Sequence, residues 1–251
     1  MSKGKGSSEQ ILDLIDRGGI KQINDIINDK SIVITSDDWW YPKSKDKPKE
    51  VSILTFLKSH SNLFNINPSY INEFKTWWVV YKGKFPTWDY IASATINGKK
   101  GIVLIEAKSH VDEFDTNGKK IKETASEASH VNHKQITEAI EKARDSINKL
   151  NRTEIKISID NCYQLSNRIA QSWWLASHGI PVTLVYLGFI GDTSMANNYK
   201  IFMNESEWKV AVENYFSIVD CKELIEIDIR TKSAPFKIIT RVASTHPGQH
   251  L

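Results

Sequence analysis

The sequence predicts an α/β domain in which helices flank a mixed β-sheet, with a helical extension at the N-terminal side. An Asn-Gly pair at 97–98 separates two apolar runs, which is the strongest short-range signal of a β-hairpin. Apolar residues recur at helical spacing over about 124–150 and 160–178. A nearly continuous apolar run at 182–190 follows, as expected of a strand buried on both faces. Together these patterns indicate a mixed sheet covered by helices.

The chain of 251 residues is short enough to fold around one core. We expect a flexible tail at 1–8, where Lys, Gly and Ser have nothing to bury, and a single domain at 9–251 with its core at about 70–215. Two short helices, with Gly18-Gly19 as the break between them, begin that domain.

Local patterns predict the other elements. The run 51–75 is expected to form two helical pieces split near 65–68, and the aromatic run 77–81 a strand. Asp160 is expected to cap the helix over 160–178, and Gly179 to end it. The remaining expected elements are strands at 87–96 and 101–109, a helix near 206–216, and strands near 224–229 and 236–242.

Charge and composition narrow the functional classes. The formal net charge of +3 suits a phosphate-bearing partner without requiring one. Cys162 and Cys221 are too few for a four-cysteine zinc site, an iron-sulfur cluster or a disulfide framework. Since no apolar run reaches the roughly 18 residues that span a bilayer, we expect a soluble, cytoplasmic protein with no membrane partner.

The register of the expected hairpin brings charged side chains together. If Asn97 and Gly98 are the central residues of a two-residue turn, opposed residues have numbers that sum to 195 and Asp89 faces Glu106. Lys108 lies two residues further along and points to the same side of the sheet. A four-residue turn would place Asp89 opposite Lys108 and keep the cluster, whereas a three-residue turn would break it.

Two carboxylates held this close repel one another unless a proton or a cation lies between them. Mg²⁺, for which Mn²⁺ can substitute, prefers oxygen ligands and is bound through one or two carboxylates plus substrate phosphates. The backbone carbonyl of Ala107 is a further candidate ligand, and Lys108 could orient water or neutralise transition-state charge. The alternative is that Asp89 begins a strand and Glu106 and Lys108 form an ordinary edge pair.

Asp89, a hairpin and then Glu106-Ala107-Lys108 resemble the PD-(D/E)xK signature of the restriction-endonuclease-like nucleases, with Pro86-Thr87-Trp88-Asp89 in place of a direct Pro-Asp pair. The strings TWDYIASA, IEAKSHVDEF and YQLSNRIAQSWWL, with SEW near 207, resemble an uncharacterised bacterial family within that superfamily over about 77–215. The resemblance implies a four-stranded mixed core sheet flanked by helices, with the aspartate and the Glu-x-Lys on neighbouring strands.

The resemblance also implies further site residues. Many relatives place another acidic residue on the helix before the sheet, for which Glu73 is preferred here and Glu50 is the alternative. Exonuclease-like branches carry Gln-x-x-x-Tyr on the helix after the hairpin. This sequence has Gln164, which we include among the catalytic candidates, but Arg168 in place of the tyrosine.

Several polar residues are candidates for contacts with nucleic acid. Gln164, Arg168 and Gln171 follow an i, i+4, i+7 spacing beside Asn167, and this polar face either grips phosphates or is simply the wet side of the helix. Lys119 and Lys120, beside Lys122, either follow a phosphate backbone or belong to a solvated loop.

The sequence thus predicts a Mg²⁺-dependent nuclease that acts on nucleic acid, with DNA as the expected substrate. A catalytically silent nucleic-acid-binding or interaction module of the same fold is one alternative, and a phosphodiesterase acting on a small nucleotide is another. A homodimer is compatible with each of these hypotheses.

Overall fold

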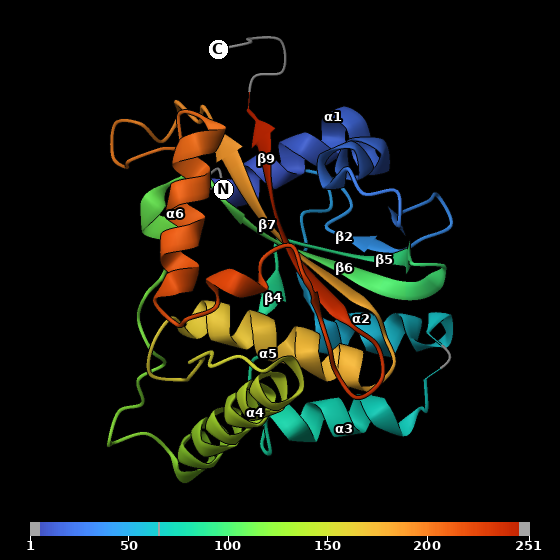
Figure 1. The fold of residues 1–251 in the computed structure, drawn as a ribbon, viewed down its shortest axis with the longest axis vertical. Coiled ribbons are helices and arrows are strands. Elements are labelled where there is room, and N and C mark those ends of the chain that lie inside the picture. Colours follow the sequence, from blue (N-terminus) through green and yellow to red (C-terminus); the bar gives the residue numbers. More distant parts are fainter. Residues whose placement is uncertain (1–5, 65, 246–251) are drawn as a thin grey trace.

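The computed structural model describes residues 6–64 and 66–245. Within these residues, seven strands form one mixed sheet in the order β1-β5-β6-β7-β9-β8, and β2 also pairs with β5 (Figure 1). β5 and β6 are antiparallel, whereas β6, β7 and β9 run parallel. The strands are β1 (Ile32–Val33), β2 (Trp40–Tyr41), β5 (Tyr90–Ile96), β6 (Lys99–Lys108), β7 (Val182–Ile190), β8 (Asp228–Ile229) and β9 (Phe236–Ser244). A separate pair joins β3 (Val51–Ser52) to β4 (Thr87–Trp88).

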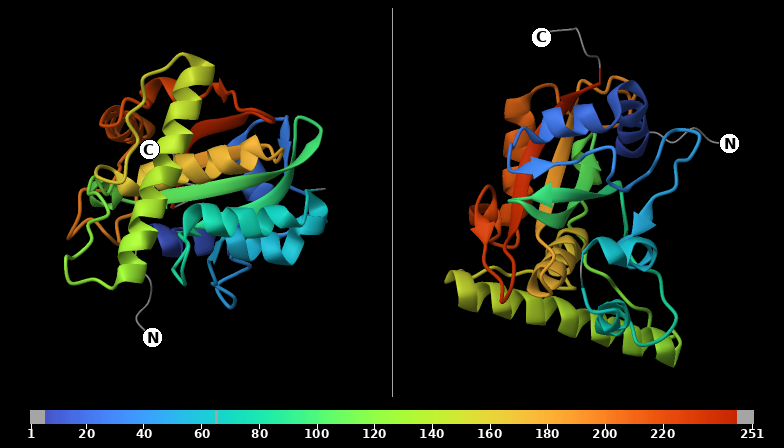
Figure 2. Two further views of the ribbon diagram at one scale, coloured as in Figure 1. Left: turned by 90° about the horizontal axis from the view of Figure 1, so that it is seen from below. Right: turned by 90° about the vertical axis from the view of Figure 1, so that its right-hand side faces the viewer.

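Helices cover both faces of the sheet (Figure 2). On one face, α1 (Ser7–Ile27) packs over alternate side chains of β5, β6, β7 and β9. The opposite face carries a larger apolar core built with α2 (Ile53–His60), α3 (Ser69–Trp78), α4 (Glu127–Asn151), α5 (Tyr163–Ser177) and α6 (Glu205–Ser217). The single-turn 3₁₀ helices are η1 (Ser61–Leu63), η2 (Val111–Glu113) and η3 (Lys222–Leu224). The central strands are therefore buried on both faces.

The hairpin between β5 and β6 has the expected two-residue turn. Asn97 and Gly98 both have positive φ, 48° and 75°, which the two central residues of this tight turn require. Ile96 consequently pairs with Lys99, and the same register continues to Tyr90 opposite Ile105. The predicted register is confirmed.

Most of the expected helices and the buried strand are present. The apolar run 182–190 forms β7, and the long helix predicted at 124–150 forms α4. The predicted break at Gly18-Gly19 appears as a kink in α1, because Gly19 has the non-helical φ of 55°. Gly179 follows α5 with a φ of 91°, as expected of a helix-terminating glycine.

Some expectations were wrong. The run 77–81 is not a strand, since α3 continues to Trp78, where Phe74 and Trp78 lie one helical turn apart and are both buried. Helix α5 begins after Cys162 with no side-chain cap, so Asp160 does not cap it. Of the strand expected near 224–229, only β8 forms, because the chain first turns through η3.

The predicted tail at 1–8 is in part contradicted. Ser7 already belongs to α1, and its hydroxyl donates a 3.0 Å hydrogen bond to Glu113 Oε1, while residues 1–5 lie outside the described chain. Within 6–64 and 66–245, none of the helices has the combination of length and apolarity needed to cross a membrane.

Candidate active site

The candidate site is built where β5 begins and β6 ends. Asp89 lies between β4 and β5, and the observed register, extended by one pair beyond Tyr90 and Ile105, places it opposite Glu106. The Ala107 N–H donates a 2.7 Å hydrogen bond to Asp89 Oδ2. Since alternate residues of a strand share a face, Glu106 and Lys108 point to the side of the sheet that α5 covers.

Glu106 holds two cations at once. Its Oε1 accepts a 2.6 Å hydrogen bond from Lys108 Nζ, and its Oε2 accepts a 2.7 Å hydrogen bond from Arg168 Nε. Burial alone would raise the pKa of Glu106, but the charges of Arg168 and Lys108 outweigh it and lower that pKa. Glu106 is therefore a buried, ionised carboxylate whose charge is fully compensated.

Gln164 extends this cluster from the first turn of α5. Its side-chain oxygen, Oε1, accepts a 2.9 Å hydrogen bond from Lys108 Nζ. The Lys108 side chain is only 4% exposed, so these two partners fix its ammonium group in one place. The structure thus brings Gln164 together with Glu106 and Lys108.

The Arg168 side chain is buried against Glu106 and the segment before β5. Its side chain is 6% exposed, its NH2 group donates a 2.8 Å hydrogen bond to the Thr87 carbonyl, and its guanidinium lies over the Trp88 ring. Asn167 is also buried, and its amide bonds the Tyr163 carbonyl while its oxygen accepts from Arg168. Both side chains are almost completely buried, so the interpretation of this helix face as its wet side is wrong, while a contact of either residue with nucleic acid stays a prediction.

Asp89 contrasts with Glu106 because it has no cation of its own. Burial first, and the charge of Glu106 second, raise the pKa of Asp89 to about 8. Although its environment is densely packed, Asp89 retains partial exposure and borders a cavity of about 440 Å³. Among the described residues, no donor bonds its second oxygen, Oδ1. That oxygen is therefore available to a ligand.

The cavity beside Asp89 is lined by the first turns of α1 and by the loop that precedes β3. Glu50 lies there, half-buried, and accepts a 3.0 Å hydrogen bond from the Thr87 hydroxyl. Glu73 does not lie there: it is exposed on α3, hydrogen-bonded to Ser69, and lines another cavity beside Trp174. Of the two acidic candidates, the structure brings Glu50 to the site.

The donor set fits a hard divalent cation in chemistry but only in part in geometry. Asp89 Oδ1 is unbonded, and the Ala107 carbonyl shares the strand edge of the N–H that bonds Asp89. Both Glu106 oxygens, however, are already held by Lys108 and Arg168. Over the described residues, no three His, Cys, Asp or Glu side chains stand close enough to hold an ion. Each Glu106 oxygen accepts one of these hydrogen bonds and keeps a second lone pair, so a cation bound through Glu106 would share that carboxylate with Lys108 and Arg168.

Lys119 and Lys120 lie outside this buried cluster, exposed in the segment between η2 and α4. Lys119 Nζ is 5.1 Å from the centre of the Tyr163 ring, and Tyr163 immediately precedes Gln164. The two lysines are therefore neighbours of the candidate site rather than members of it.

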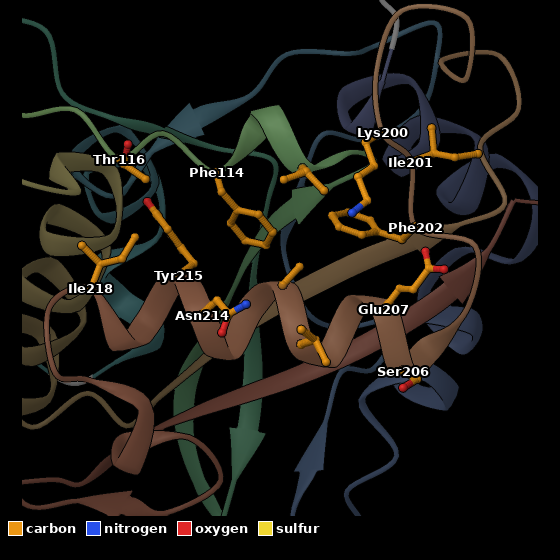
Figure 3. Close-up of a pocket in the computed structure, with 13 residues that line it drawn as sticks. Phe114, Thr116, Lys200, Ile201, Phe202, Ser206, Glu207, Asn214, Tyr215 and Ile218 are labelled. Atoms are coloured by element: carbon orange, nitrogen blue, oxygen red, sulfur yellow. The ribbon is translucent and has the colours of Figure 1, made fainter.

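A separate hollow of about 550 Å³ lies along α6. Figure 3 shows Phe114, Phe202 and Tyr215 among the side chains that line it, and none of the candidate catalytic residues reaches it. The Tyr215 hydroxyl already donates to the Asp115 carbonyl at 3.0 Å. Lys200, Ser206 and Glu207 also line this hollow, and Glu207 Oε2 accepts a 3.0 Å hydrogen bond from the Met203 N–H.

The sequence did not predict that Arg168 pairs with Glu106 or that it bonds the Thr87 carbonyl. It also favoured Glu73 over Glu50 as the further acidic residue of the site, whereas Glu50 is the one that lies there. The i, i+4 spacing of Gln164 and Arg168 did signal that both point from one face of α5. Compared with family models, with curated proteins and with solved structures, the chain shows no significant match.

Proposed function

We propose that this chain is a metal-dependent nuclease that hydrolyses phosphodiester bonds in nucleic acid, with DNA as the expected substrate and Mg²⁺ or Mn²⁺ as the cofactor. The observation that carries the proposal is the shared position of Asp89, Glu106 and Lys108 on one face of a hairpin, beside a cavity. The strands β5, β6, β7 and β9 support it, since the PD-(D/E)xK resemblance implies a four-stranded mixed core sheet flanked by helices.

The residues would divide the chemistry as follows. Asp89, Glu106 and the Ala107 carbonyl would hold the cation, with Glu50 facing the same cavity. When bound, a divalent cation polarises the scissile phosphate and lowers the pKa of a bound water. Lys108, fixed between Glu106 and Gln164, would place its positive charge where the phosphoryl oxygens gain negative charge. Arg168 contributes indirectly by orienting Glu106.

A cleavage assay tests the proposal. The protein is incubated with supercoiled, linear and single-stranded DNA and with RNA, each with Mg²⁺ or Mn²⁺, beside Glu106→Gln and Lys108→Gln. Glu141→Gln and Lys209→Gln are charge-matched controls on exposed helix positions. We expect cleavage by the parent and both controls, and a loss of about 100-fold or more in each site variant. Absence of cleavage by the parent in either metal would overturn the proposal.

One observation favours a second candidate, a catalytically silent module that binds nucleic acid. Both oxygens of Glu106 are paired with buried cations, which is also how a structural ion-pair cluster would look. The same assay separates the two candidates: binding of DNA or RNA without cleavage in any metal identifies the silent module.

A further inference from the structure

A second charged feature lies next to the candidate active site. Five exposed lysines line a groove of about 450 Å³, and no acidic side chain joins them in its lining. Lys82 and Lys84 come from the segment between α3 and β4; Lys119, Lys120 and Lys122 come from the segment before α4. Across 6–64 and 66–245, none of the five forms an ion pair, so their charge is left for an external anion.

The two walls of this lysine groove are fixed to adjacent residues of α4. The Asn132 side-chain oxygen accepts hydrogen bonds from the backbone N–H groups of Val80 and Tyr81, at 3.0 and 2.9 Å. His133 Nε2 lies 2.7 Å from the Lys119 carbonyl oxygen. The backbone of each wall is thus held in place while the lysine side chains remain solvated. This arrangement differs from a loose basic loop, because the spacing of the walls is set by the helix.

Both walls adjoin segments that carry residues of the candidate active site. The wall that carries Lys82 and Lys84 continues through Thr87, whose carbonyl is held by Arg168, to Asp89. On the other wall, Lys119 lies over the ring of Tyr163, the residue before Gln164. An anionic chain in the groove would therefore lie beside the segments that hold Asp89 and Gln164.

We propose that the lysine groove binds the sugar-phosphate backbone of a nucleic-acid strand, without reading its sequence, and leads it to Asp89 and Lys108. The inference rests on the proposed function for the direction of the strand. Ammonium groups are point charges that neutralise phosphates, whereas base recognition uses bidentate arginine or amide contacts. The side-chain amide in the groove lining, that of Asn132, is already bonded to the backbone of Val80 and Tyr81, so sequence-independent binding follows.

The test measures binding in the absence of catalysis. Fluorescence anisotropy with labelled 20-nucleotide single strands and duplexes of two unrelated sequences is recorded in EDTA at several salt concentrations. The variants are the pairs Lys82→Gln with Lys84→Gln, and Lys120→Gln with Lys122→Gln. The control with the same charge change is the pair Lys58→Gln with Lys209→Gln, because both lysines are exposed and neither belongs to the groove lining. Circular dichroism verifies that each variant is folded.

For each groove pair on duplex DNA, we expect about a tenfold loss of affinity and a salt dependence of the logarithm of the binding constant that is shallower by about 1.8. The control pair should match the parent, and the two sequences should bind alike. Parent-like binding by both groove pairs would overturn the proposal, as would equal competition by poly-aspartate of matched charge. Because no metal is present, cleavage failure in the separate assay would refute the nuclease while leaving this binding result intact.

Discussion

The buried charges at the end of β6 and the exposed charges of the lysine groove are handled in opposite ways. In the first region, Glu106, Lys108 and Arg168 are almost fully withdrawn from water, and both cations contact the one carboxylate of Glu106. In the second region, five lysines remain in solvent and none is paired within the described chain. Buried charges must be compensated because desolvation is costly, whereas solvated charges need no compensation. The first region is thus coupled to folding, and the second is free to serve binding alone.

The largest effect is expected when the shared carboxylate is removed. Glu106→Ala leaves Lys108 and Arg168 buried without their common partner, which should cost about 3–5 kcal/mol of unfolding free energy. Urea denaturation measures it. Glu106→Gln is the matched variant, since it keeps the shape and an acceptor oxygen, and it should lose less. If Glu106→Ala unfolds at the parent's urea midpoint, Glu106 does not stabilise the buried charges of Lys108 and Arg168.

A smaller loss is expected when the geometry of one partner is changed but its charge is kept. Arg168→Lys cannot bond both the Glu106 carboxylate and the Thr87 carbonyl, and it loses the planar contact with Trp88. Hydrogen bonds to charged groups are worth about 1.5–3 kcal/mol each, so the loss of one such bond sets the scale. Urea denaturation beside Arg144→Lys, a half-buried arginine on α4 that pairs with Asp145, gives the comparison. Equal stability of the two variants would mean that charge alone holds Glu106.

The unpaired acid of the first region should make stability depend on pH. The pKa of Asp89 is raised from 3.8 to about 8 in the fold, so the folded state binds this proton more tightly than the unfolded chain does. Its contribution is fully present below about pH 3.8 and is lost as the pH rises towards 8, by at most about 1.4 kcal/mol per pH unit.

Asp89→Asn removes this dependence while keeping an acceptor for the Ala107 N–H. In EDTA, the difference in unfolding free energy between parent and variant should change steadily between pH 5 and 8, with the parent losing ground as the pH rises. Parallel stability curves for the two proteins would show that Asp89 stays ionised in the fold.

The two regions also differ in how far the sequence predicted them. The Asn97-Gly98 turn requires positive φ at both residues, so it fixed the register of β5 and β6 and thereby the proximity of Asp89 to Glu106. That inference was local. The pairing of Arg168 with Glu106 depends instead on how α5 packs against β6, 62 residues away in sequence, and helical periodicity cannot supply it.

The wrong strand at Trp77-Trp78 has a similar cause. β-Branched and aromatic residues favour strands, yet here Phe74, Trp77 and Trp174 pack ring against ring and stabilise one more turn of α3. Tertiary contacts decided the outcome, and the local pattern could not reveal them. The same limit applies to the lysine groove. Its wall at Lys82 and Lys84 directly follows the segment 77–81 that was wrongly predicted to be a strand.

The smallest effect on stability is expected for a single lysine of the groove, and it distinguishes the lysine groove from the buried charge cluster. Lys120→Gln removes one solvated charge from the lysine groove and should leave the unfolding free energy within about 0.5 kcal/mol of the parent. The salt dependence of duplex binding should become shallower by about 0.9, the value for one phosphate contact. Lys58→Gln serves as control. A stability loss as large as that of Arg168→Lys would show that Lys120 stabilises the fold. Lys120 would then not be a charge that serves binding alone.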